Sequence, residues 1–254
     1  MDKVLFITVR YSSSRLPGKC LQKLGNNSVL GHCILRAKAA NFRVIVCTGS
    51  DVADSAIVSE STKHGCEVFT GDSLNKILRW SSCFQNFKIE FAHIVDGDDP
   101  YFDPTEISES LNLLLSEKLD LVRTSLKSDS GFASVGLSVT AKFMKELAQR
   151  SEDLSSQDLD VIPWNLLLKD QDRWKFAPDN HLIEGNSTQL RLTLDYPEDL
   201  ELLQKIALEL DYFAPRIEVE KFILDNPTIY KINSNRNIDF IENKKVQLLR
   251  NFNY

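Results

Sequence analysis

The first part of the chain has a pattern typical of alternating strands and helices. Residues 3–9 form a nearly continuous apolar run rich in β-branched side chains, which is typical of a strand covered on both faces. Residues 29–40 carry apolar side chains at helical spacing, and residues 43–47 return to strand character. A strand, a helix and a second strand in this order predict a βαβ unit and therefore a parallel sheet.

The alternation continues along the chain and loosens after residue 120. The pattern predicts helices over 52–63, 74–84 and 141–150, and strands over 67–69, 90–95, 120–124 and 133–139. Strands separated by helices indicate an α/β protein with a mostly parallel central sheet and helices on both faces. The less regular part adds an α+β elaboration, which we expect within about 127–189.

The last part of the chain divides into a strand, a helix and a tail. A strand is predicted over 189–194, and Pro197 opens a helix whose first turn carries Glu198 and Asp199, where acids complement the helix dipole. From residue 233 onward asparagine is frequent and apolar positions become rare. We therefore expect a single domain over 1–232 and a loosely attached tail over 233–254, with one short helix near 239–249.

Composition and charge narrow the class of protein. The 254 residues are 43% hydrophobic and 26% charged, which is typical of a soluble globular protein. The net charge of −6 argues against nonspecific binding to nucleic acid or to an anionic membrane, and no apolar run is long enough for a membrane span. The five cysteines include no C-x-x-C pair. We expect a cytoplasmic protein with reduced thiols and neither a disulfide framework nor a zinc ribbon.

The loop after the first strand concentrates cations in an acidic protein. It carries Arg10, Arg15 and Lys19, three hydroxyls at 12–14 and a Pro-Gly turn. Ligands of parallel sheets bind at the carboxyl ends of strands, and such a set of donors suits a triphosphate. The sequence argues against a Walker P-loop, because Ser13 and Cys20 stand where that motif has Gly and Ser or Thr. The absence of the dinucleotide fingerprint likewise disfavours a Rossmann dehydrogenase.

The loop after the strand at 90–95 concentrates acids. Asp103 precedes Pro104 and Glu106, as a helix N-cap in a capping box does. Asp96, Asp98 and Asp99 have no such local explanation, and clustered carboxylates at a strand end suit a magnesium ion beside phosphates. Asp195, alone, is explained as an acid at a helix start, but it would supply the second carboxylate that a magnesium site near Asp98 needs.

Four motifs together resemble a known family. The run RYSSSRLPGKCLQKL at 10–24 is similar to the nucleotide-binding signature of the sugar-acid cytidylyltransferases, which are the CMP-KDO and CMP-acylneuraminate synthetases, and it is closest to the spore coat polysaccharide biosynthesis protein F group. The resemblance continues in VFTGDSLNKILRW at 68–80, IVDGDDPYFDP at 94–104 and LRLTLDYPEDLELL at 190–203. It covers about the first 125 residues and 190 to about 233.

The resemblance implies a GT-A-like, Rossmann-like nucleotidyltransferase fold and a reaction. Such enzymes transfer CMP from CTP to a sugar or sugar acid for surface polysaccharide or glycoconjugate biosynthesis, release pyrophosphate, depend on magnesium and form homodimers. The implied triphosphate contacts, which are also the catalytic cations, are Arg10, Arg15 and Lys19. Asp98 and Asp195 would hold Mg²⁺, and Asp98 would also be a catalytic residue. The nucleotide would further contact Ser12, Ser13, Ser14, Gly71, Asp72 and Asp96.

The residues leave two other functions open. Asp96-Gly97-Asp98 is a D-x-D sequence of the kind that GT-A glycosyltransferases use to hold a metal, and a nucleotide-binding module without catalysis has the same fold. The cation-rich loop favours a triphosphate over a diphosphosugar, because it supplies more positive charge than a diphosphate needs. The acceptor is unassigned, because Cys20, Asp96 and Asp99 differ from the Pro, Gln and Glu usual in CMP-KDO synthetases.

Overall fold

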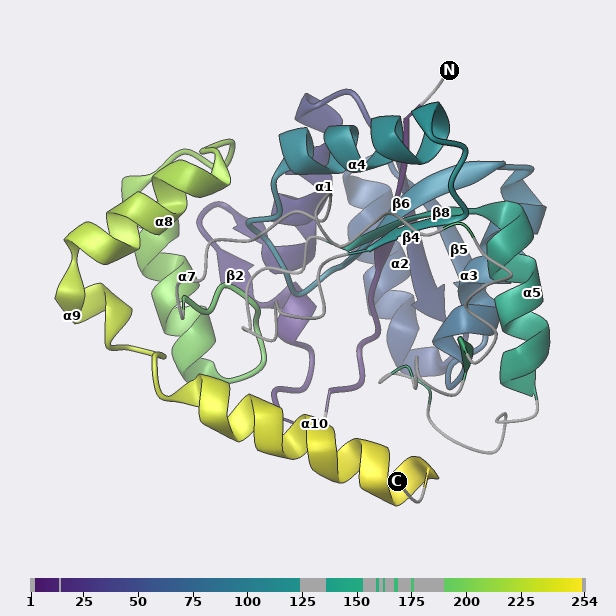
Figure 1. The fold of residues 1–254 in the computed structure, drawn as a ribbon. Coiled ribbons are helices and arrows are strands. Elements are labelled where there is room, and N and C mark those ends of the chain that lie inside the picture. The colour runs from purple at the N-terminus through teal and green to yellow at the C-terminus, as the bar shows by residue number, and fades with distance from the viewer. Residues whose placement is uncertain are drawn as a thin grey trace.

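A six-stranded sheet forms the centre of the molecule (Figure 1). The computed structural model describes residues 3–13, 15–123, 136–152, 159, 162, 167–168, 175 and 190–252. The strands are β1 (Val4–Thr8), β4 (Arg43–Gly49), β5 (Glu67–Gly71), β6 (Phe91–Asp96), β7 (Leu121–Arg123) and β8 (Leu137–Thr140). They lie in the order β5-β4-β1-β6-β8-β7, with only β8 antiparallel to its neighbours. The predicted α/β class and mainly parallel sheet are confirmed.

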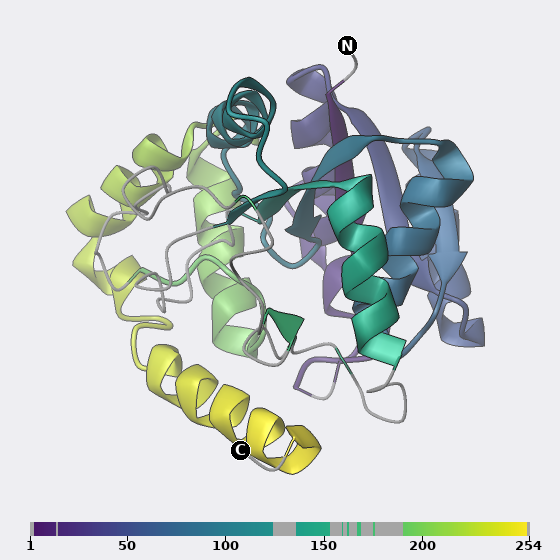
Figure 2. The same ribbon diagram turned by 45° about the vertical axis from the view of Figure 1, so that its right-hand side comes forward.

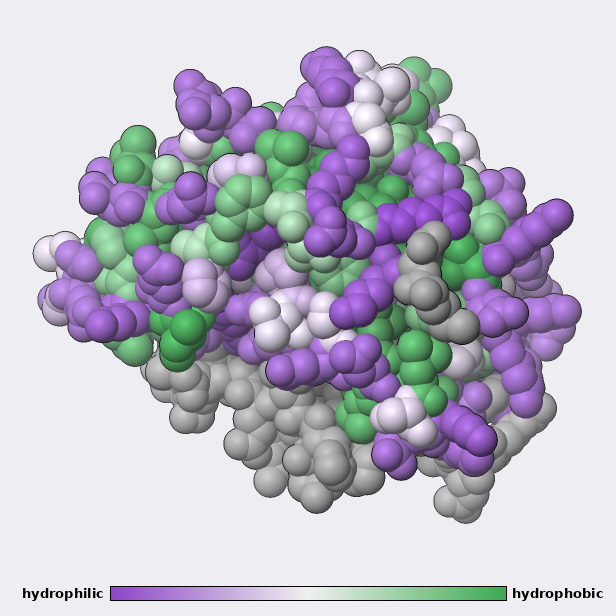
Figure 3. Space-filling model, turned by 90° about the horizontal axis from the view of Figure 1, so that it is seen from above, coloured by the Kyte–Doolittle hydropathy of each residue, from purple (hydrophilic) through white to green (hydrophobic). Residues whose placement is uncertain are grey.

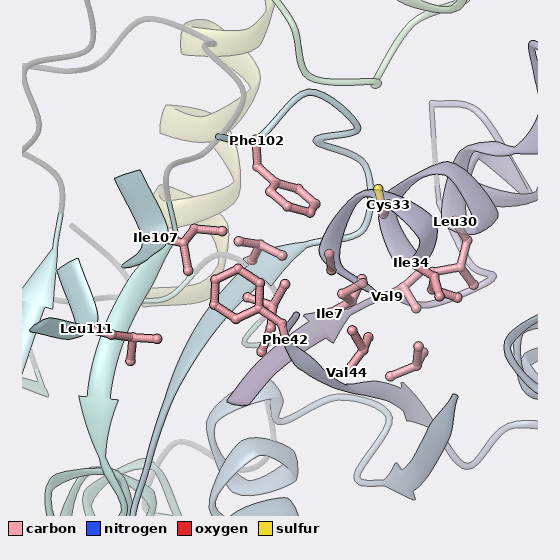
Figure 4. Close-up of a cluster of buried hydrophobic side chains, with 14 of the residues drawn as sticks. Ile7, Val9, Leu30, Cys33, Ile34, Phe42, Val44, Phe102, Ile107 and Leu111 are labelled. Carbon is pink, nitrogen blue, oxygen red and sulfur yellow. The ribbon is translucent and has the colours of Figure 1, made fainter. Parts of the chain in front are cut away.

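Helices cover both faces of this sheet. One face packs against α1 (Val29–Ala39), α2 (Ser55–Lys63) and α4 (Pro104–Ser116), and Figure 4 shows its buried cluster around Ile7, Ile34 and Phe42. The other face packs against α3 (Lys76–Phe87) and α5 (Ala141–Glu152). Every residue of β1 is buried, because apolar side chains from both clusters meet it.

Two predicted α-helices begin a few residues later than expected. The helix predicted over 52–63 starts as a short 3-10 helix, η2 (Val52–Asp54), and continues as α2. The helix predicted over 74–84 starts at Lys76, because the Asn75 side chain caps it by accepting a hydrogen bond from the Leu78 amide. Between β1 and α1 lie η1 (Lys19–Leu21) and a small hairpin of β2 (Lys23–Leu24) and β3 (Asn27–Ser28).

A third apolar core lies beside the sheet, and it includes a segment that was wrongly predicted as a strand. It is built by α7 (Pro197–Glu209), α8 (Arg216–Asp225), α9 (Pro227–Tyr230) and the segment 190–194. That segment, predicted as a strand, is not one. Leu190, Leu192 and Leu194 alternate as in a strand, but they are buried against the helices of this core rather than paired within the sheet. Leu194 donates one backbone hydrogen bond to Asp98, at 2.8 Å.

The C-terminal helix α10 (Arg236–Phe252) is longer than the short helix predicted near 239–249. It runs across the lower end of the molecule in Figures 1 and 2, the end at which β1 finishes. The residues leading into it are attached to the rest of the chain: the Asn233 side chain donates hydrogen bonds to the Arg191 carbonyl at 3.0 Å and to Asp199 at 2.8 Å. Most of the elaboration expected within 127–189 lies outside the described residues.

The surface mixes polar and apolar side chains. Seen from above, hydrophilic side chains cover much of the molecule with smaller apolar groups between them (Figure 3). Among the described helices, none is both long enough and apolar enough to span a membrane.

The strand register brings the two predicted functional loops together. Thr8, the last residue of β1, pairs with Cys47 of β4 on one side and with Asp96 of β6 on the other. The cation-rich loop therefore leaves the sheet directly beside the acidic loop, at the carboxyl edge where ligands of such sheets bind.

Candidate functional site

Lys19 joins the two carboxylates predicted to hold a metal. Its Nζ donates to Oδ2 of Asp98 and, at 2.9 Å, to Oδ1 of Asp195. These three residues come from η1, from the turn after β6 and from the segment before α7. The structure thus brings together the cation-rich loop, the acidic loop and the motif at 190–203, which are far apart in the sequence.

Arg15 approaches Asp195 from the same side as Lys19. Its Nη2 lies 2.5 Å from Oδ1 of Asp195, the oxygen that Lys19 also contacts. Its Nε is buried and has no hydrogen-bond partner within the described part of the chain. A buried N–H donor of an arginine is normally paired, so this one marks a place where an acceptor atom fits.

The charges in this cluster shift one another's pKa values. Burial disfavours the charged form of Lys19, but Asp98 and Asp195 outweigh burial and raise the pKa of Lys19 above its ordinary value. Burial also acts against the Asp195 carboxylate, yet Lys19 and Arg15 hold its pKa well below the usual range. The pKa of Asp98 is raised by burial and by the nearby Asp96 and Asp195 charges. Lys19 and Asp195 are therefore fully charged near neutral pH.

The acidic loop forms a compact group of oxygen donors. Carboxylate oxygens of Asp96, Asp98 and Asp99 all lie within 4.8 Å of one another. Asp96 is additionally paired with Lys76 of α3, whose Nζ lies 2.6 Å from Asp96 Oδ1 and 5.3 Å from the centre of the Trp80 ring. Hard carboxylate oxygens are the ligands that magnesium prefers, so the chemistry of this donor set fits such an ion. Of the two carboxylates predicted to hold it, Asp98 belongs to this group, and Asp195 is joined to Asp98 through Lys19.

Arg10 lies on the other side of the site. Its Nη1 donates to the carbonyl of Ser73, just beyond β5. The Ser73 hydroxyl accepts a hydrogen bond from the Ser50 amide at 3.1 Å. The buried Asp54 accepts one from the Tyr11 amide at 2.7 Å and holds the start of the cation-rich loop.

A glycine is required in this part of the site. A Cβ on Gly49, at the end of β4, would lie 2.3 Å from Oδ2 of Asp54 and 3.0 Å from the Ser73 hydroxyl. A side chain at this position would therefore displace the groups that hold the loop.

The serines of the cation-rich loop differ in their surroundings. Ser12 is exposed, and the Ser13 hydroxyl accepts a long hydrogen bond of 3.4 Å from the Leu16 amide. Ser14 lies outside the described residues. Gly18 has a left-handed φ of 66° and turns the chain toward Lys19, while its amide donates to the Tyr11 carbonyl at 3.1 Å.

Gly71 and Asp72 lie at the end of β5, next to the Arg10 contact. Oδ1 of Asp72 accepts hydrogen bonds from the amides of Leu74, at 2.9 Å, and Asn75, at 2.6 Å. Asp72 therefore orders the turn into α3. A Cβ on Gly71 would lie 2.7 Å from the Phe69 ring.

Sequence reasoning missed three contributors to the site. Arg191 binds Asp195, Lys76 binds Asp96, and Asp54 holds the Tyr11 amide. Lys76 and Arg191 stand inside motifs that the sequence singles out, and both are cations that an acidic cluster needs nearby. Asp54 stands outside every motif, and only the fold brings it to the loop.

The fold and the site define a class of protein that binds a phosphate-bearing ligand. Cations and a group of carboxylates suited to a metal lie together at the carboxyl edge of a parallel sheet, where nucleotides bind in such folds. The model of the family described as "Cytidylyltransferase" matches residues 4–216. The chain belongs to the cytidylyltransferase family.

Individual relatives agree with this assignment. The spore coat polysaccharide biosynthesis protein SpsF of Bacillus subtilis is 24% identical over 215 residues, which are 81% of this chain and 87% of that protein. A solved cytidylyltransferase from Leptospira borgpetersenii has a TM-score of 0.79 at 22% identity and covers 91% of this chain and 97% of its own. A CMP:2-keto-3-deoxy-manno-octonic acid synthetase solved with CTP has a TM-score of 0.62 at 17% identity, covering 83% and 100%. The predicted nucleotidyltransferase fold is thus confirmed.

Proposed function

We propose that this cytidylyltransferase transfers CMP from CTP to a sugar acid of the KDO or sialic-acid kind, with magnesium, and releases pyrophosphate. The observation that carries the proposal is the junction at Lys19, where a cation of the predicted triphosphate loop meets both predicted metal ligands, Asp98 and Asp195. The unpaired donor of Arg15 beside this junction supports an anionic ligand there.

The reaction would use the residues as follows. A hydroxyl oxygen of the sugar acid attacks the α-phosphorus of CTP, its proton passes to solvent, and the bond to the leaving pyrophosphate breaks. Arg10, Arg15 and Lys19 bind the triphosphate and neutralise the negative charge that accumulates on the leaving group. Asp98 and Asp195 would hold Mg²⁺, which when bound lowers the pKa of a coordinated hydroxyl and neutralises phosphate charge.

The nucleoside would lie over the ends of β1, β4 and β5. There Ser12, which is exposed, and Ser13, with Gly71 and Asp72, are our candidates for nucleotide contacts. The family resemblance adds Ser14. Asp96 is a further candidate for a nucleotide contact, because its carboxylate lies close to that of Asp98. A neighbour in fold, described as a CMP:2-keto-3-deoxy-manno-octonic acid synthetase complexed with CTP, supports both the nucleotide and the acceptor class.

The setting of the reaction is part of the proposal. The five described cysteines are free thiols, which supports a reducing compartment, and we place the enzyme in the cytoplasm. The family resemblance supports a homodimer of one domain over 1–232 with an appended C-terminal segment. Light scattering at several protein concentrations tests the dimer.

The proposal is tested by pyrophosphate release with each of the four nucleoside triphosphates and a panel of sugar acids. We expect release with CTP and one sugar acid, and a loss of at least about 100-fold in kcat for Asp98→Asn, because the variant lacks a charged metal ligand. Asp225→Asn, which removes the same charge at an exposed position, is the matched control. Unchanged turnover of Asp98→Asn would refute the metal assignment.

A further inference from the structure

Asp195 is held from behind by a fully buried arginine. Nη2 of Arg191 donates to Oδ2 of Asp195 at 2.8 Å, and its Nε donates to Oδ1 of Asp199, also at 2.8 Å. The amide of Asp195 in turn donates to Oδ2 of Asp199 at 2.8 Å. One carboxylate oxygen and the backbone of Asp195 are thus fixed, which leaves its Oδ1 directed to Lys19 and Arg15.

Residues near the C-terminus hold Arg191 in turn. The Asn233 side chain donates to the Arg191 carbonyl at 3.0 Å and to Oδ1 of Asp199 at 2.8 Å, so it braces both partners of Asp195. The guanidinium carbon of Arg191 lies 4.9 Å from the centre of the Phe240 ring on α10. This distance is within the range at which an aromatic face attracts a guanidinium group.

Tyr196, the neighbour of Asp195, provides a second attachment for α10. The guanidinium carbons of Arg15, Arg191 and Arg236 lie between 5.1 and 5.7 Å from the centre of its ring. Arg236 also binds Glu198 at 2.6 Å, and the Asn243 side chain donates to the Tyr196 hydroxyl at 3.0 Å. Figure 1 shows α10 crossing the end of the molecule where these contacts occur.

We propose that α10 and the residues leading into it form part of the active site, where Phe240 and Asn233 act through Arg191 as positioning residues for Asp195. The inference rests on the proposed function, since it takes Asp195 to be a metal ligand. Groups that orient a metal ligand determine affinity for the ion, because a ligand that must first be ordered binds more weakly. Phe240 and Asn233 contact neither substrate nor metal; they fix the Asp195 carboxylate, which would hold the metal.

The test measures Mn²⁺ binding by electron paramagnetic resonance with CTP present, alongside the KM for CTP. Phe240→Ala should weaken Mn²⁺ binding about 10-fold, because Arg191 loses its aromatic support, while the KM for CTP changes less than about twofold. Phe240→Trp keeps an aromatic face and should restore Mn²⁺ affinity. Ile238→Ala, on the same helix and 65% exposed, is the control and should bind Mn²⁺ like the wild type.

Each outcome separates this inference from the proposed function. If Asp195→Asn weakens Mn²⁺ binding and Phe240→Ala leaves it unchanged, the role of α10 is wrong and the metal site stands. If the wild type and Asp195→Asn bind Mn²⁺ equally, the role of α10 and the assignment of Asp195 as a metal ligand are both wrong. Should Phe240→Ala lose its cooperative thermal transition, Arg236→Gln tests the same attachment at a side chain on the surface, with the same expected weakening.

Discussion

Lys19 links three motifs at the scale of single residues. Its ammonium group is held between two carboxylates in a largely buried position, and those carboxylates raise its pKa despite burial. A lysine in this state remains charged at and well above neutral pH. It is suited to neutralise phosphate charge and unsuited to act as a general base.

Replacing Lys19 should raise the affinity for the metal ion and lower the affinity for CTP. In Lys19→Met, Mn²⁺ alone should bind more tightly than to the wild type, because no ammonium group competes for Asp98 and Asp195. CTP should bind about 10-fold more weakly, since a charge-assisted hydrogen bond to phosphate is lost. Calorimetry with each ligand measures both effects, and Lys221→Met at an exposed site is the control. Weaker Mn²⁺ binding in the variant would contradict this assignment.

The environment of His32 should make the free energy of unfolding depend on pH in the acid range. This effect is unrelated to the candidate site. Burial and the nearby Arg36 lower its pKa to about 4, although Asp211 acts in the opposite direction. Its Nε2 is buried with no hydrogen-bond partner among the described residues, and its ring lies 5.0 Å from that of Tyr101. The unfolded chain therefore binds a proton below about pH 6.5 that the folded chain takes up only near pH 4.

The sign of the effect follows from this difference. As pH falls from 7 to 4, protonation of unfolded His32 should lower the free energy of unfolding by about 3 kcal/mol. His32→Phe removes the titrating group, so its free energy of unfolding should fall less over the same range. Urea unfolding at several pH values measures the difference between the two curves. Parallel curves would show that His32 is not held neutral.

Elements are positioned by side chains at their ends. Asp103 caps α4 by accepting a hydrogen bond from the Thr105 amide at 2.8 Å, and its other oxygen accepts one from the Arg216 amide at 3.0 Å. The predicted N-cap is thus confirmed, but Glu106 binds Arg216 instead of completing a capping box. A single carboxylate therefore joins α4 of the sheet layer to α8 of the third core.

Asp103→Ala should destabilise the fold without altering the chemistry. Two amides lose their acceptor, so the free energy of unfolding should fall by about 2 kcal/mol, while the KM for CTP stays within about twofold. Asp103→Asn keeps one acceptor oxygen and should lose about half as much. Chemical unfolding and steady-state kinetics on the same preparations measure both quantities. A large change in KM with unchanged stability would place Asp103 in the site instead.

For the whole molecule, the strand and helix pattern was predictable because the central parallel strands β1, β4 and β6 are almost entirely buried. Runs such as residues 4–8 carry that burial directly in the sequence. The segment 190–194 was not predictable as a non-strand, because its buried leucines alternate in the same way while facing a helical core. Periodicity reports burial, and only the tertiary structure decides which neighbour provides it.

The candidate site was predictable in its residue types and not in its pairings. The clusters of cations and acids identify Lys19, Asp98 and Asp195, but sequence gives no sign that Lys19 contacts both carboxylates. The role of α10 was also hidden, because asparagines and sparse apolar positions resemble a solvated tail. Asn233 nevertheless is buried and hydrogen-bonded, which composition alone does not reveal.

The central claim is the transfer of CMP to a sugar acid, and the most direct measurement follows the α-phosphate. The enzyme is incubated with Mg²⁺, CTP labelled at the α-phosphorus and each sugar acid in turn. The products are then separated and identified by mass spectrometry. We expect the label to move into a CMP–sugar acid in an amount equal to the pyrophosphate released. Label that remains in CTP with every sugar acid, while a nucleotide sugar offered in parallel is consumed, would contradict it and favour a glycosyltransferase.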